Sequence, residues 1–253
     1  MKVISYNING IRAVLKKDFL TWLEATDPDV LCLQEVKALE QQFDQLPFRA
    51  LGYEFYLFPA QKKGYSGVAI LTKEKPKRIV LGCGIEKYDA EGRVIRCDFK
   101  DYSVMSVYMP SGASKPERQV FKLEWLDFFQ SYMNQLKKEL PKLLICGDFN
   151  LCHRPIDIHN PYGLDGYPGF TEEERQWMSA FLDNGFVDLF RAYNSAPHQY
   201  SWWSYRSGAR QKNLGWRIDY ILGSQGIENT LKRAAHLDRA IHSDHCPVMV
   251  EIA

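Results

Sequence analysis

The chain has 253 residues, of which 45% are hydrophobic and 25% are charged, as in an ordinary globular protein with a sizeable core. Lysine and arginine number 32 and aspartate and glutamate 31, a formal net charge of +1. The composition therefore excludes a disordered chain, and the molecule has no strong overall field to attract a polyanion. Nucleic-acid binding would therefore need a local patch of positive charge.

The cysteines and the apolar runs indicate the compartment. None of the six cysteines forms a C-x-x-C pair, and Cys32 and Cys146 lie inside apolar runs, so we predict reduced core thiols. No apolar run approaches the roughly 20 residues that cross a bilayer, and the chain begins directly in a strand-like pattern. We expect a cytoplasmic protein without membrane contact. No linker or low-complexity run divides it, so we expect a single domain over residues 1–253.

Short apolar runs rich in β-branched and aromatic residues predict strands along the whole chain. In chain order they cover residues 3–6, 30–33, 67–71, 104–109, 143–146, 218–222 and 248–252. Helical periodicity occurs at residues 18–25 and 116–139 and again after Thr171, which forms a capping-box pattern with Glu174. Several strands are too close together for a helical crossover and are therefore antiparallel. The class is mixed α/β, and a sandwich of sheets with helices outside is the expected packing.

Both halves of the chain contain an apolar strand that ends in an amide or an acid. The strand at residues 4–7 ends in Asn7, and the one at residues 144–148 ends in Asp148. This similarity suggests a pseudo-repeat, although two such strand ends also arise by chance.

The polar residues attached to these strands form an oxygen-rich set. They are Asn7, Asn9, Glu35, Asp148, Asn150, Asp219, Asp244 and His245. Carboxylate and amide oxygens suit a hard cation, Mg²⁺ or Mn²⁺, whereas zinc would favour clusters of histidine and cysteine. This set therefore favours a magnesium site.

Each residue of the set also has a plainer interpretation. The asparagines before Gly10 are common turn formers, Glu35 can end a solvated strand, and the acid and amide after Gly147 can form a simple bend. Asp219 is harder to explain, because a carboxylate within an apolar strand must be paired or hydrogen-bonded. All the plainer interpretations would have to hold at once, so we favour a reaction centre.

Six short strings of this chain resemble the exonuclease III type of abasic-site (AP) endonuclease, in the same order. They are SYNING at 5–10, LQEVK at 33–37, KGYSGV at 63–68, GDFN at 147–150, GWRIDY at 215–220 and SDHCP at 243–247. The resemblance extends over residues 2–252. The GDFN turn and the Asp-His pair are shared with the wider endonuclease/exonuclease/phosphatase superfamily, whereas KGYSG and the aromatic run at residues 200–206 resemble the DNA-repair branch.

The resemblance implies a DNase-like fold, a four-layered α/β sandwich of two packed mixed sheets flanked by helices. It implies a Mg²⁺-dependent DNA phosphodiesterase of base excision repair, with Mn²⁺ able to substitute. Such an enzyme hydrolyses the bond 5′ to an abasic site, leaves a 3′-hydroxyl, and has some 3′ to 5′ exonuclease or 3′-end trimming activity. The implied partner is double-stranded DNA with abasic sites, and we expect a monomer.

The resemblance also implies a role for each matching residue. The metal ligands are Glu35, Asn7 and Asp244. A possible second metal position is formed by Asp148, Asn150 and His245. In catalysis Asp148 orients and deprotonates the attacking water, and Asn150 contacts the phosphate. Two further groups contact the phosphate, namely the imidazole of His245, which Asp219 holds, and the phenol of Tyr108. Two positions depart from the family pattern, namely Asn9, where a carboxylate is frequent, and Ser111, where a longer amide is frequent.

The densest local positive charge is mixed with aromatic residues, which suits DNA better than a small phosphate ester. The cations are Arg206, Arg210, Lys212 and Arg217, and the aromatic residues are Trp202, Trp203, Tyr205 and Trp216. The alternative is that the aromatic residues form core and the cations a solvated face. The resemblance assigns Trp202, Trp216 and Ile218 to an apolar pocket for a sugar without its base, and Tyr65 and Arg206 to the DNA surface. Further candidates for phosphate contacts are Lys62, Lys63, Arg93 and Arg118.

Two other functions remain open at this point. A phosphatase of phosphoinositides or another small phosphate ester would use the same chemistry, but the aromatic and basic run argues against it. A non-catalytic DNA-binding module would not need the complete set of Glu35, Asp148, Asn150, Asp219 and His245.

Overall fold

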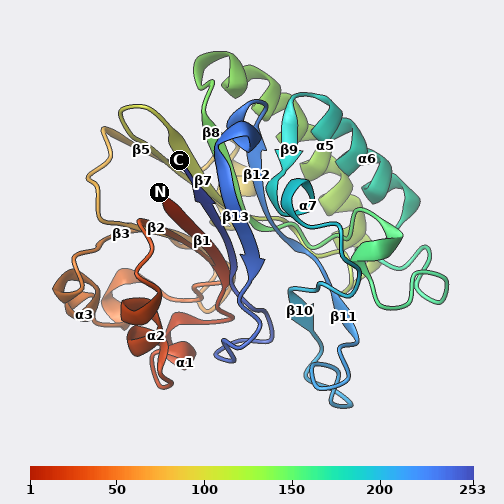
Figure 1. Cartoon of the computed structure of the whole chain (residues 1–253), viewed down its shortest axis with the longest axis horizontal. Coiled ribbons are helices and arrows are strands. Elements are labelled where there is room, and N and C mark those ends of the chain that lie inside the picture. The colour runs from red at the N-terminus through yellow and green to blue at the C-terminus, as the bar shows by residue number, and fades with distance from the viewer.

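The computed structural model describes all 253 residues. Two six-stranded sheets pack face to face, and helices cover their outer faces (Figure 1). This arrangement confirms the predicted four-layered α/β sandwich. None of the helices combines the length and the apolar character that crossing a membrane requires.

The first sheet contains both ends of the chain. Its strands, in spatial order, are β13 (Leu231–His236), β14 (Val248–Ile252), β1 (Lys2–Asn7), β2 (Val30–Gln34), β4 (Val68–Thr72) and β3 (Glu54–Phe58). β1 and β2 are parallel, and every other neighbouring pair is antiparallel. The first and last strands of the chain are therefore neighbours, as the N and C labels of Figure 1 indicate.

The second sheet repeats this plan. Its strands, in spatial order, are β5 (Arg78–Leu81), β6 (Val94–Asp98), β7 (Ser103–Tyr108), β8 (Leu143–Asp148), β12 (Asp219–Ser224) and β9 (Phe186–Asp188). Again the central pair, β7 and β8, is parallel and the others are antiparallel. A separate small hairpin consists of β10 (Trp202–Trp203) and β11 (Gly215–Trp216).

The two sheets share one pattern of parallel and antiparallel neighbours, so the structure contains a pseudo-repeat, but the predicted pairing of its strands was wrong. β1 and β2 take the places of β7 and β8, and in both sheets a helix connects this parallel pair. The sequence similarity had suggested that the strand of Asn7 corresponds to that of Asp148. By topology β8 corresponds to β2, so that Asp148 corresponds to the end of β2, next to Glu35.

Three apolar layers hold the sandwich together. The middle layer lies between the sheets and contains residues such as Val3, Cys32 and Cys146. A second layer lies between the first sheet and the helices α1 (Ile11–Val14), α2 (Phe19–Thr26) and α3 (Leu46–Ala50). A third lies between the second sheet and the helices α5 (Pro116–Glu139) and α6 (Glu172–Asp183). Three short turns of 3-10 helix, Glu40–Gln42, Pro155–Asp157 and Ile227–Thr230, and two short helices, α4 (Glu86–Asp89) and α7 (Leu189–Tyr193), complete the fold.

All seven predicted strands and the three predicted helices are present. The capping box is also present, because the Thr171 hydroxyl accepts from the Glu174 N–H and the Glu174 carboxylate accepts from the Thr171 N–H. The strands that sequence analysis missed are β3, β5, β6, β9 and β13 and the small hairpin. Most lie at sheet edges, where mixed exposure weakens the apolar pattern.

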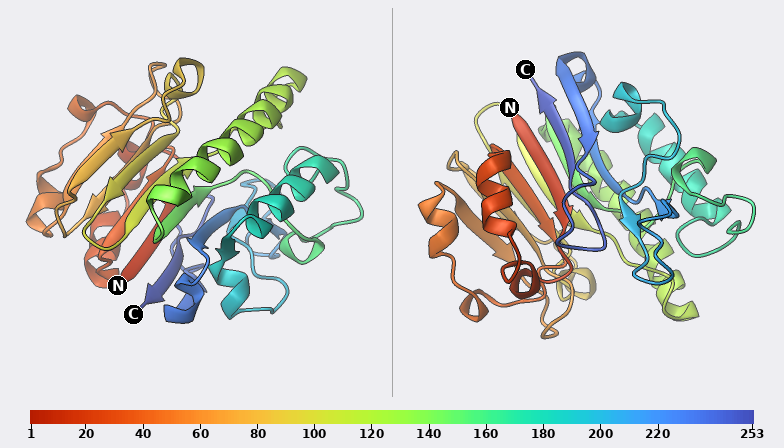
Figure 2. Two further views of the ribbon diagram at one scale, coloured as in Figure 1. Left: turned by 90° about the horizontal axis from the view of Figure 1, so that it is seen from above. Right: turned by 60° about the horizontal axis from the view of Figure 1, so that its bottom comes forward.

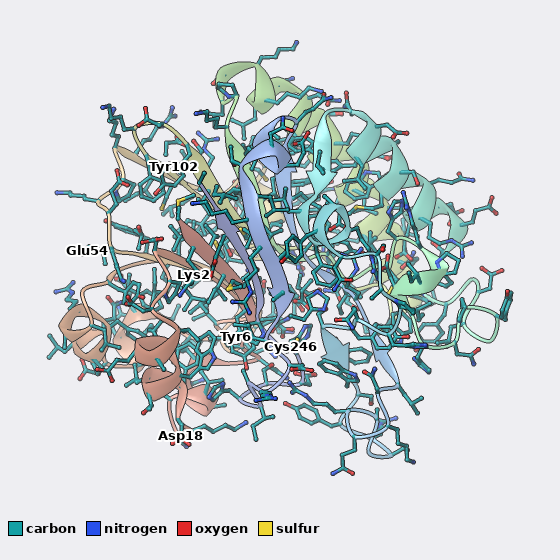
Figure 3. All side chains as sticks on the ribbon, in the orientation of Figure 1. Lys2, Tyr6, Asp18, Glu54, Tyr102 and Cys246 are labelled. Carbon is teal, nitrogen blue, oxygen red and sulfur yellow. The ribbon has the colours of Figure 1, made fainter.

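One end of the sandwich gathers the predicted site residues. There the carboxyl ends of β1, β2, β7 and β8 meet the amino ends of β12 and β14. In Figure 3, β1 runs from Lys2, on the side of the chain termini, down to Tyr6 near Cys246. The right-hand view of Figure 2 brings this end forward and shows the β10–β11 hairpin and the loop before β14 beside it.

Candidate active site

Three predicted residues lie in one row across the second sheet. Tyr108 is the register partner of Asp148 on the parallel strand β8, and Asp219 is the partner of Asp148 on the other side. The facing sheet contributes Asn7, the last residue of β1, and Glu35, directly after β2. Sheet register therefore places these five residues at the same end of the sandwich.

Gly147 permits the close approach of β8 to β7 just before the catalytic turn. A Cβ atom at this position would lie 2.0 Å from the carbonyl oxygen of Val107, a distance that no side chain tolerates. Phe149 then packs inward, with its ring centroid 5.1 Å from that of Tyr220. The residues on either side of it, Asp148 and Asn150, consequently project toward the site.

The turns that follow β1, β2 and β8 each contain a left-handed residue other than glycine. The φ angles are 47° at Asn9, 52° at Glu35 and 52° at Asn150. Asparagine tolerates this region, but glutamate rarely adopts it, so Glu35 is locally strained. Its carbonyl accepts from the Gly10 N–H at 2.8 Å. Such strain persists only where the surrounding structure enforces it, and it is concentrated at functional sites.

Asn7 connects the two sheets across the site. Its side-chain Nδ2 donates to Glu35 Oε1 and to Asp148 Oδ2, each at 2.8 Å. The Asn7 Oδ1 accepts from the Asn9 N–H at 3.0 Å, so the amide orientation follows from its partners. Asn7 therefore fixes the spacing of the two carboxylates.

A carboxylate on each side holds the imidazole of His245. Its Nδ1 lies 2.9 Å from Asp219 Oδ2, and its Nε2 lies 3.9 Å from Asp148 Oδ2. Asp219 is itself fixed, because its Oδ2 accepts from the Ser201 hydroxyl at 2.6 Å. Burial alone would lower the pKa of His245, but Asp219, Asp148 and Asp244 outweigh it and raise that pKa to about 10. The ring is therefore protonated at neutral pH.

Burial and like charges shift two further groups. Burial raises the pKa of Asp148 to about 7; His245 opposes the shift, and Asp219 and Glu35 add to it. Burial, with the charges of Glu35 and Asp148, also raises the pKa of the Tyr108 phenol. The phenol is therefore a hydrogen-bond donor at neutral pH, and the carboxyl of Asp148 titrates close to it.

Three side chains are close enough to share one metal ion. Ligand atoms of Glu35, Asp148 and His245 lie within 4.8 Å of one another. The predicted ligand set of Glu35, Asn7 and Asp244 shares Glu35 with this group and stays a prediction. The Asp244 carboxylate accepts from Asn9 Nδ2 at 3.0 Å and from Trp202 Nε1 at 3.1 Å. Asp244 thus lies beside this group and ties it to the neighbouring pocket.

Lys37 was not predicted as a site residue. Its Nζ lies 2.6 Å from Glu35 Oε2 and donates to Asn9 Oδ1 at 2.6 Å. An asparagine at position 9 leaves Glu35 as the only carboxylate bound to this ammonium group. A cation bound at Glu35 would therefore compete with Lys37 for the same oxygen.

A pocket of about 280 Å³ opens directly beside these groups. Its aromatic wall is formed by Trp202 and Trp216, whose rings meet edge to face with centroids 6.1 Å apart. Tyr167 continues this wall, with its centroid 6.0 Å from that of Trp216. The lining residues are Glu35, Tyr108, Ser111, Ala113, Asp148, Asn150, Tyr167, Pro168, Trp202, Trp216, Ile218, Asp244 and His245.

The predicted pocket residues are thus brought together, and Ala113, Tyr167 and Pro168 are additions. The sequence contains no signal for these three, since they lie in loops with no periodicity. Ser111, one of the two departures from the family pattern, also lines the pocket.

The predicted DNA-contact residues lie outside the pocket. Arg206 is exposed in the loop between β10 and β11. The Tyr65 hydroxyl accepts from Arg93 Nη2 at 3.0 Å and from Arg118 Nη2 at 3.2 Å, and both guanidinium groups also bind Glu91. Arg93 is buried, so this cluster presents Tyr65 and Arg118 rather than Arg93 to the surface.

Two arginines of the basic and aromatic run are structural, contrary to the prediction. Arg217 is fully buried, with its guanidinium 2.7 Å from Asp157 Oδ1 and 2.7 Å from Asp188 Oδ2. Arg210 donates to the carbonyls of Ser243, Asp238 and Ala240. Trp203 is buried as well. The alternative interpretation of core aromatic residues therefore holds for this part of the run.

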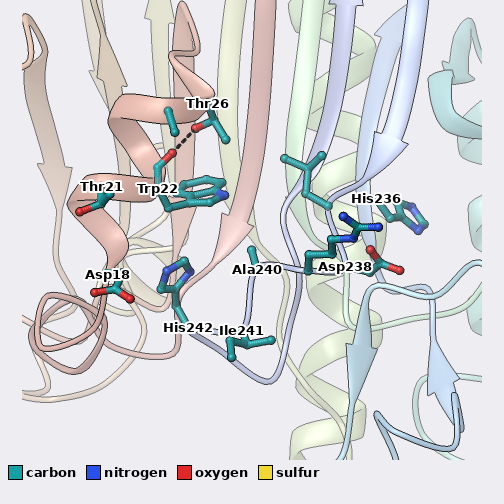
Figure 4. A pocket seen from close by; sticks show the side chains of 12 residues that line it. Asp18, Thr21, Trp22, Thr26, His236, Asp238, Ala240, Ile241 and His242 are labelled. Atoms are coloured by element: carbon teal, nitrogen blue, oxygen red, sulfur yellow. Dashed lines mark hydrogen bonds between the residues drawn. The ribbon is translucent and has the colours of Figure 1, made fainter.

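A second hollow of about 550 Å³ lies between α2 and the loop before β14. Figure 4 shows Trp22 of α2 and His242 of the loop on its walls, with ring centroids 5.8 Å apart. None of the predicted catalytic or metal-binding residues lines it. The chemistry of the molecule is therefore concentrated in the smaller pocket.

Comparison with known proteins agrees with this geometry. The sequence profile described as Endonuclease/Exonuclease/phosphatase family matches residues 4–245. The chain is 42% identical to an exodeoxyribonuclease of Bacillus subtilis (strain 168) over 250 residues, which cover 98% of both chains. An AP endonuclease from Archaeoglobus fulgidus superposes with a TM-score of 0.91 at 31% identity, over 100% of this chain and 99% of that one.

A third similar protein is the 3′ phosphatase NExo from Neisseria, bound to a product DNA hairpin. It superposes with a TM-score of 0.91 at 28% identity, over 100% of this chain and 99% of that one. The resemblance predicted from the motifs is confirmed, and the chain belongs to the Endonuclease/Exonuclease/phosphatase family.

Proposed function

We propose that this DNA-repair nuclease is a Mg²⁺-dependent phosphodiesterase that cuts duplex DNA on the 5′ side of an abasic site and leaves a 3′-hydroxyl. The observation that carries the proposal is that the buried group of Asp148, Asp219 and His245 opens directly into a small pocket with aromatic walls. The site thus combines groups that hydrolyse a phosphodiester with a cavity for a flat, apolar part of the substrate.

Glu35 and Asp148 are the carboxylates that would hold the metal. His245 lies beside them, but its protonated ring would act as a donor and not as a ligand. Their mutual repulsion, which contributes to the raised pKa of Asp148, is the electrostatic setting that a divalent cation relieves. Oxygen ligands favour Mg²⁺, with Mn²⁺ able to substitute. When bound, such an ion would neutralise charge that develops on the phosphoryl oxygens. A second metal position at Asp148, Asn150 and His245 would require the His245 ring to lose its proton.

Asp148 is the proposed base for the attacking water. Its Oδ1 accepts from the Asn150 N–H at 2.8 Å, and its Oδ2 accepts from Asn7 Nδ2 at 2.8 Å, so the carboxyl group is fixed in orientation. A pKa of about 7 places it where a base can accept a proton at neutral pH. Asn150, oriented by its bond to the Met109 carbonyl, is the proposed neighbour that contacts the phosphate.

His245 and Tyr108 are the proposed donors to the scissile phosphate. Asp219 occupies Nδ1 of the ring, so the protonated Nε2 is left to face the reaction centre. The phenol of Tyr108 remains protonated and lines the same pocket. Two preorganised donors in a partly desolvated site stabilise charge on phosphoryl oxygens more strongly than water does.

The pocket is proposed to accept the sugar that has lost its base. Trp202, Trp216 and Ile218 offer apolar surfaces, and extrusion of such a sugar costs little because no base stacking is lost. Arg206 and Tyr65 are proposed to contact the flanking DNA. We propose that the enzyme also trims 3′ ends, because a terminal sugar phosphate presents the same groups, and that it acts as a monomer.

The alternative of a phosphatase for inositol phosphates is less well supported. A compact polyanion requires several free cations around its phosphates, whereas no arginine or lysine lines this pocket. Its walls combine aromatic and aliphatic side chains with the carboxylates of the site.

The test offers the purified protein four substrates, each with Mg²⁺ and with chelator. They are a labelled duplex with one synthetic abasic site, the same duplex intact, a duplex with a 3′-phosphate, and an inositol polyphosphate. We expect Mg²⁺-dependent cleavage 5′ to the abasic site, with slower removal of the 3′-phosphate. Phosphate release from the inositol compound alone would contradict the proposal.

A further inference from the structure

A fully buried ion pair lies behind the candidate site and has no role in the chemistry proposed above. Lys122, on α5, and Glu174, in the first turn of α6, are both 0% exposed and bind each other directly. Taking two charges out of water is costly unless further hydrogen bonds satisfy them. The remaining partners of these two groups therefore indicate what the pair does.

Lys122 reaches the catalytic turn. Its Nζ donates to the backbone carbonyl of Asn150 at 2.7 Å. Asn150 is one of the left-handed residues of the site, and its peptide lies outside the sheet ladder. The ammonium group therefore fixes the backbone of a residue whose N–H binds Asp148 and whose side chain binds the Met109 carbonyl.

Glu174 reaches the wall of the pocket. Its Oε2 accepts from the Gly169 N–H at 2.7 Å as well as from the Thr171 N–H at 3.0 Å. A Cβ atom on Gly169 would lie 3.0 Å from the Trp216 ring and 3.1 Å from the Asn150 carbonyl oxygen. Gly169 therefore touches both the aromatic wall and the catalytic turn, and it directly follows Tyr167 and Pro168, which line the pocket.

A capping box does not account for these contacts. The box requires only that the glutamate accept from the N–H of the N-cap residue, here Thr171. Glu174 uses its second oxygen for Lys122 and for the Gln119 amide, and it adds a bond to Gly169. One carboxylate thus joins α5, α6 and the pocket loop.

We propose that the Lys122–Glu174 pair is a positioning device that fixes the catalytic turn at Asn150 and the pocket wall at Gly169 relative to each other. Neither residue lines the pocket, so both act through their neighbours. The inference rests on the proposed function, because turnover on abasic DNA is one of its two readouts.

Lys137 provides a matched control on the same helix. Its Nζ donates to the Asn184 carbonyl at 2.6 Å and to Asn184 Oδ1 at 2.8 Å, at the opposite end of α6. Lys122 connects α5 to α6 through the Glu174 carboxylate and Lys137 does so through the Asn184 carbonyl, but only Lys122 reaches the site. If connecting the two helices were the only role of each lysine, both variants should keep their kcat under conditions in which they are folded.

The first readout is a double-mutant cycle on kcat and KM for the abasic duplex. We expect Lys122→Met to lower kcat about a hundredfold, with KM changed little, because displacement of a catalytic group by about 1 Å has that effect. In an Asn150→Ala background the same substitution should change kcat less than about threefold, because both changes disturb one element. Lys137→Met should leave kcat nearly unchanged in either background.

The second readout is hydrogen exchange of the segment around Gly169, which needs no activity. Lys122→Met should accelerate this exchange and Lys137→Met should not. If Lys122→Met does not fold, Lys122→Met with Glu174→Gln removes the lone buried charge while keeping an acceptor for the helix start. An equal loss of kcat in both backgrounds, or unchanged exchange, would overturn the inference. A wild-type protein inactive on the abasic duplex would instead refute the proposed function and leave the exchange test valid.

Discussion

The imidazole of His245 is held by Asp219 through an Nδ1 to Oδ2 distance of 2.9 Å. This contact fixes the ring so that its other nitrogen faces Asp148, 3.9 Å away. Asp219 is fixed in turn by the Ser201 hydroxyl. The orientation and the charge of the imidazole therefore both depend on one buried carboxylate, which can be removed with little change of shape.

Replacement of Asp219 by asparagine should lower the pKa of His245 from about 10 toward the ordinary value of 6.5. The wild-type ring should stay protonated from pH 6 to 8, whereas the variant ring should titrate within or below that range. We expect kcat on abasic DNA to fall about a hundredfold or more. NMR titration of the imidazole measures the shift, and His153 in the same spectrum is the control. An unchanged midpoint for His245 would contradict the role of Asp219.

Two neighbouring substitutions should change Mg²⁺ affinity in opposite directions. Glu35→Gln removes a carboxylate of the metal group and should weaken binding, while Lys37→Met removes the competing ammonium 2.6 Å from Glu35 Oε2 and should tighten it. The rise in melting temperature with Mg²⁺ concentration measures both, because a ligand that binds the folded state stabilises it. A shift of both variants in the same direction would exclude this competition.

The sequence was sufficient to predict the fold class and the central strands, because buried strands keep an unbroken apolar run. β6 escaped detection although it is buried, since Arg96 interrupts its run and pairs with Asp98 within the same strand. Edge strands such as β5 are mixed in exposure and resemble loops. The correct pairing of the pseudo-repeat could not be predicted, because it depends on sheet order and not on residue identity.

The site was predicted where a short string contains several polar residues, as at Asp148 and Asn150. Lys122 and Tyr167 act from a helix and a loop without such a string, so only the tertiary structure reveals them. The burial of Arg217 follows from the alternation of its neighbours. Successive side chains of an extended segment point to opposite sides, so Trp216 and Ile218 in the pocket imply that Arg217 points away from it.

The salt dependence of DNA binding should distinguish the exposed Arg206 from Arg210, which has a structural role. Arg206→Ala should reduce the slope of log K against log salt for duplex binding by about 0.9, the value for one phosphate contact. Arg210→Ala should leave the slope unchanged and lower the melting temperature, because Arg210 holds the carbonyls of the loop before β14. Binding assays at several salt concentrations, with a melting curve for each variant, measure both. An unaltered slope for Arg206→Ala would exclude that contact.

Tyr167 should contribute to selection of the abasic sugar. Tyr167→Ala opens the aromatic wall beside Trp216 and should lower kcat/KM for the abasic duplex about tenfold. This is the loss expected when part of the apolar contact of an aromatic ring with the substrate is removed. The kcat/KM for cleavage at an intact 3′ end should fall by a smaller factor. Tyr162→Ala is the matched control, since Tyr162 is 96% exposed on the same loop and does not line the pocket. If both variants lost the same kcat/KM, the effect would come from disturbance of the loop and not from loss of the Tyr167 ring.

The buried group of Arg217, Asp157 and Asp188 should be the main reason why the free energy of unfolding falls in acid. Burial alone would raise the pKa of Asp157, but the guanidinium groups of Arg217 and Arg191 outweigh it and lower that pKa to about 2. The ordinary value is 3.8, so the folded state binds this proton less readily than the unfolded chain. The resulting stabilisation is complete above about pH 4 and is lost as the pH falls through about 2.

Arg217→Met should therefore lower the free energy of unfolding at pH 7 by about 3 to 5 kcal/mol, because it leaves Asp188 buried without its cation. It should also flatten the dependence of stability on pH between about 4 and 2, since the pKa of Asp157 rises toward its ordinary value. Urea unfolding at several pH values measures both effects. Arg175→Met, which breaks an exposed pair with Asp165, should cost less than about 1 kcal/mol. If Arg217→Met instead kept the wild-type slope in acid, the stabilisation of Asp157 would have to come from Arg191 alone.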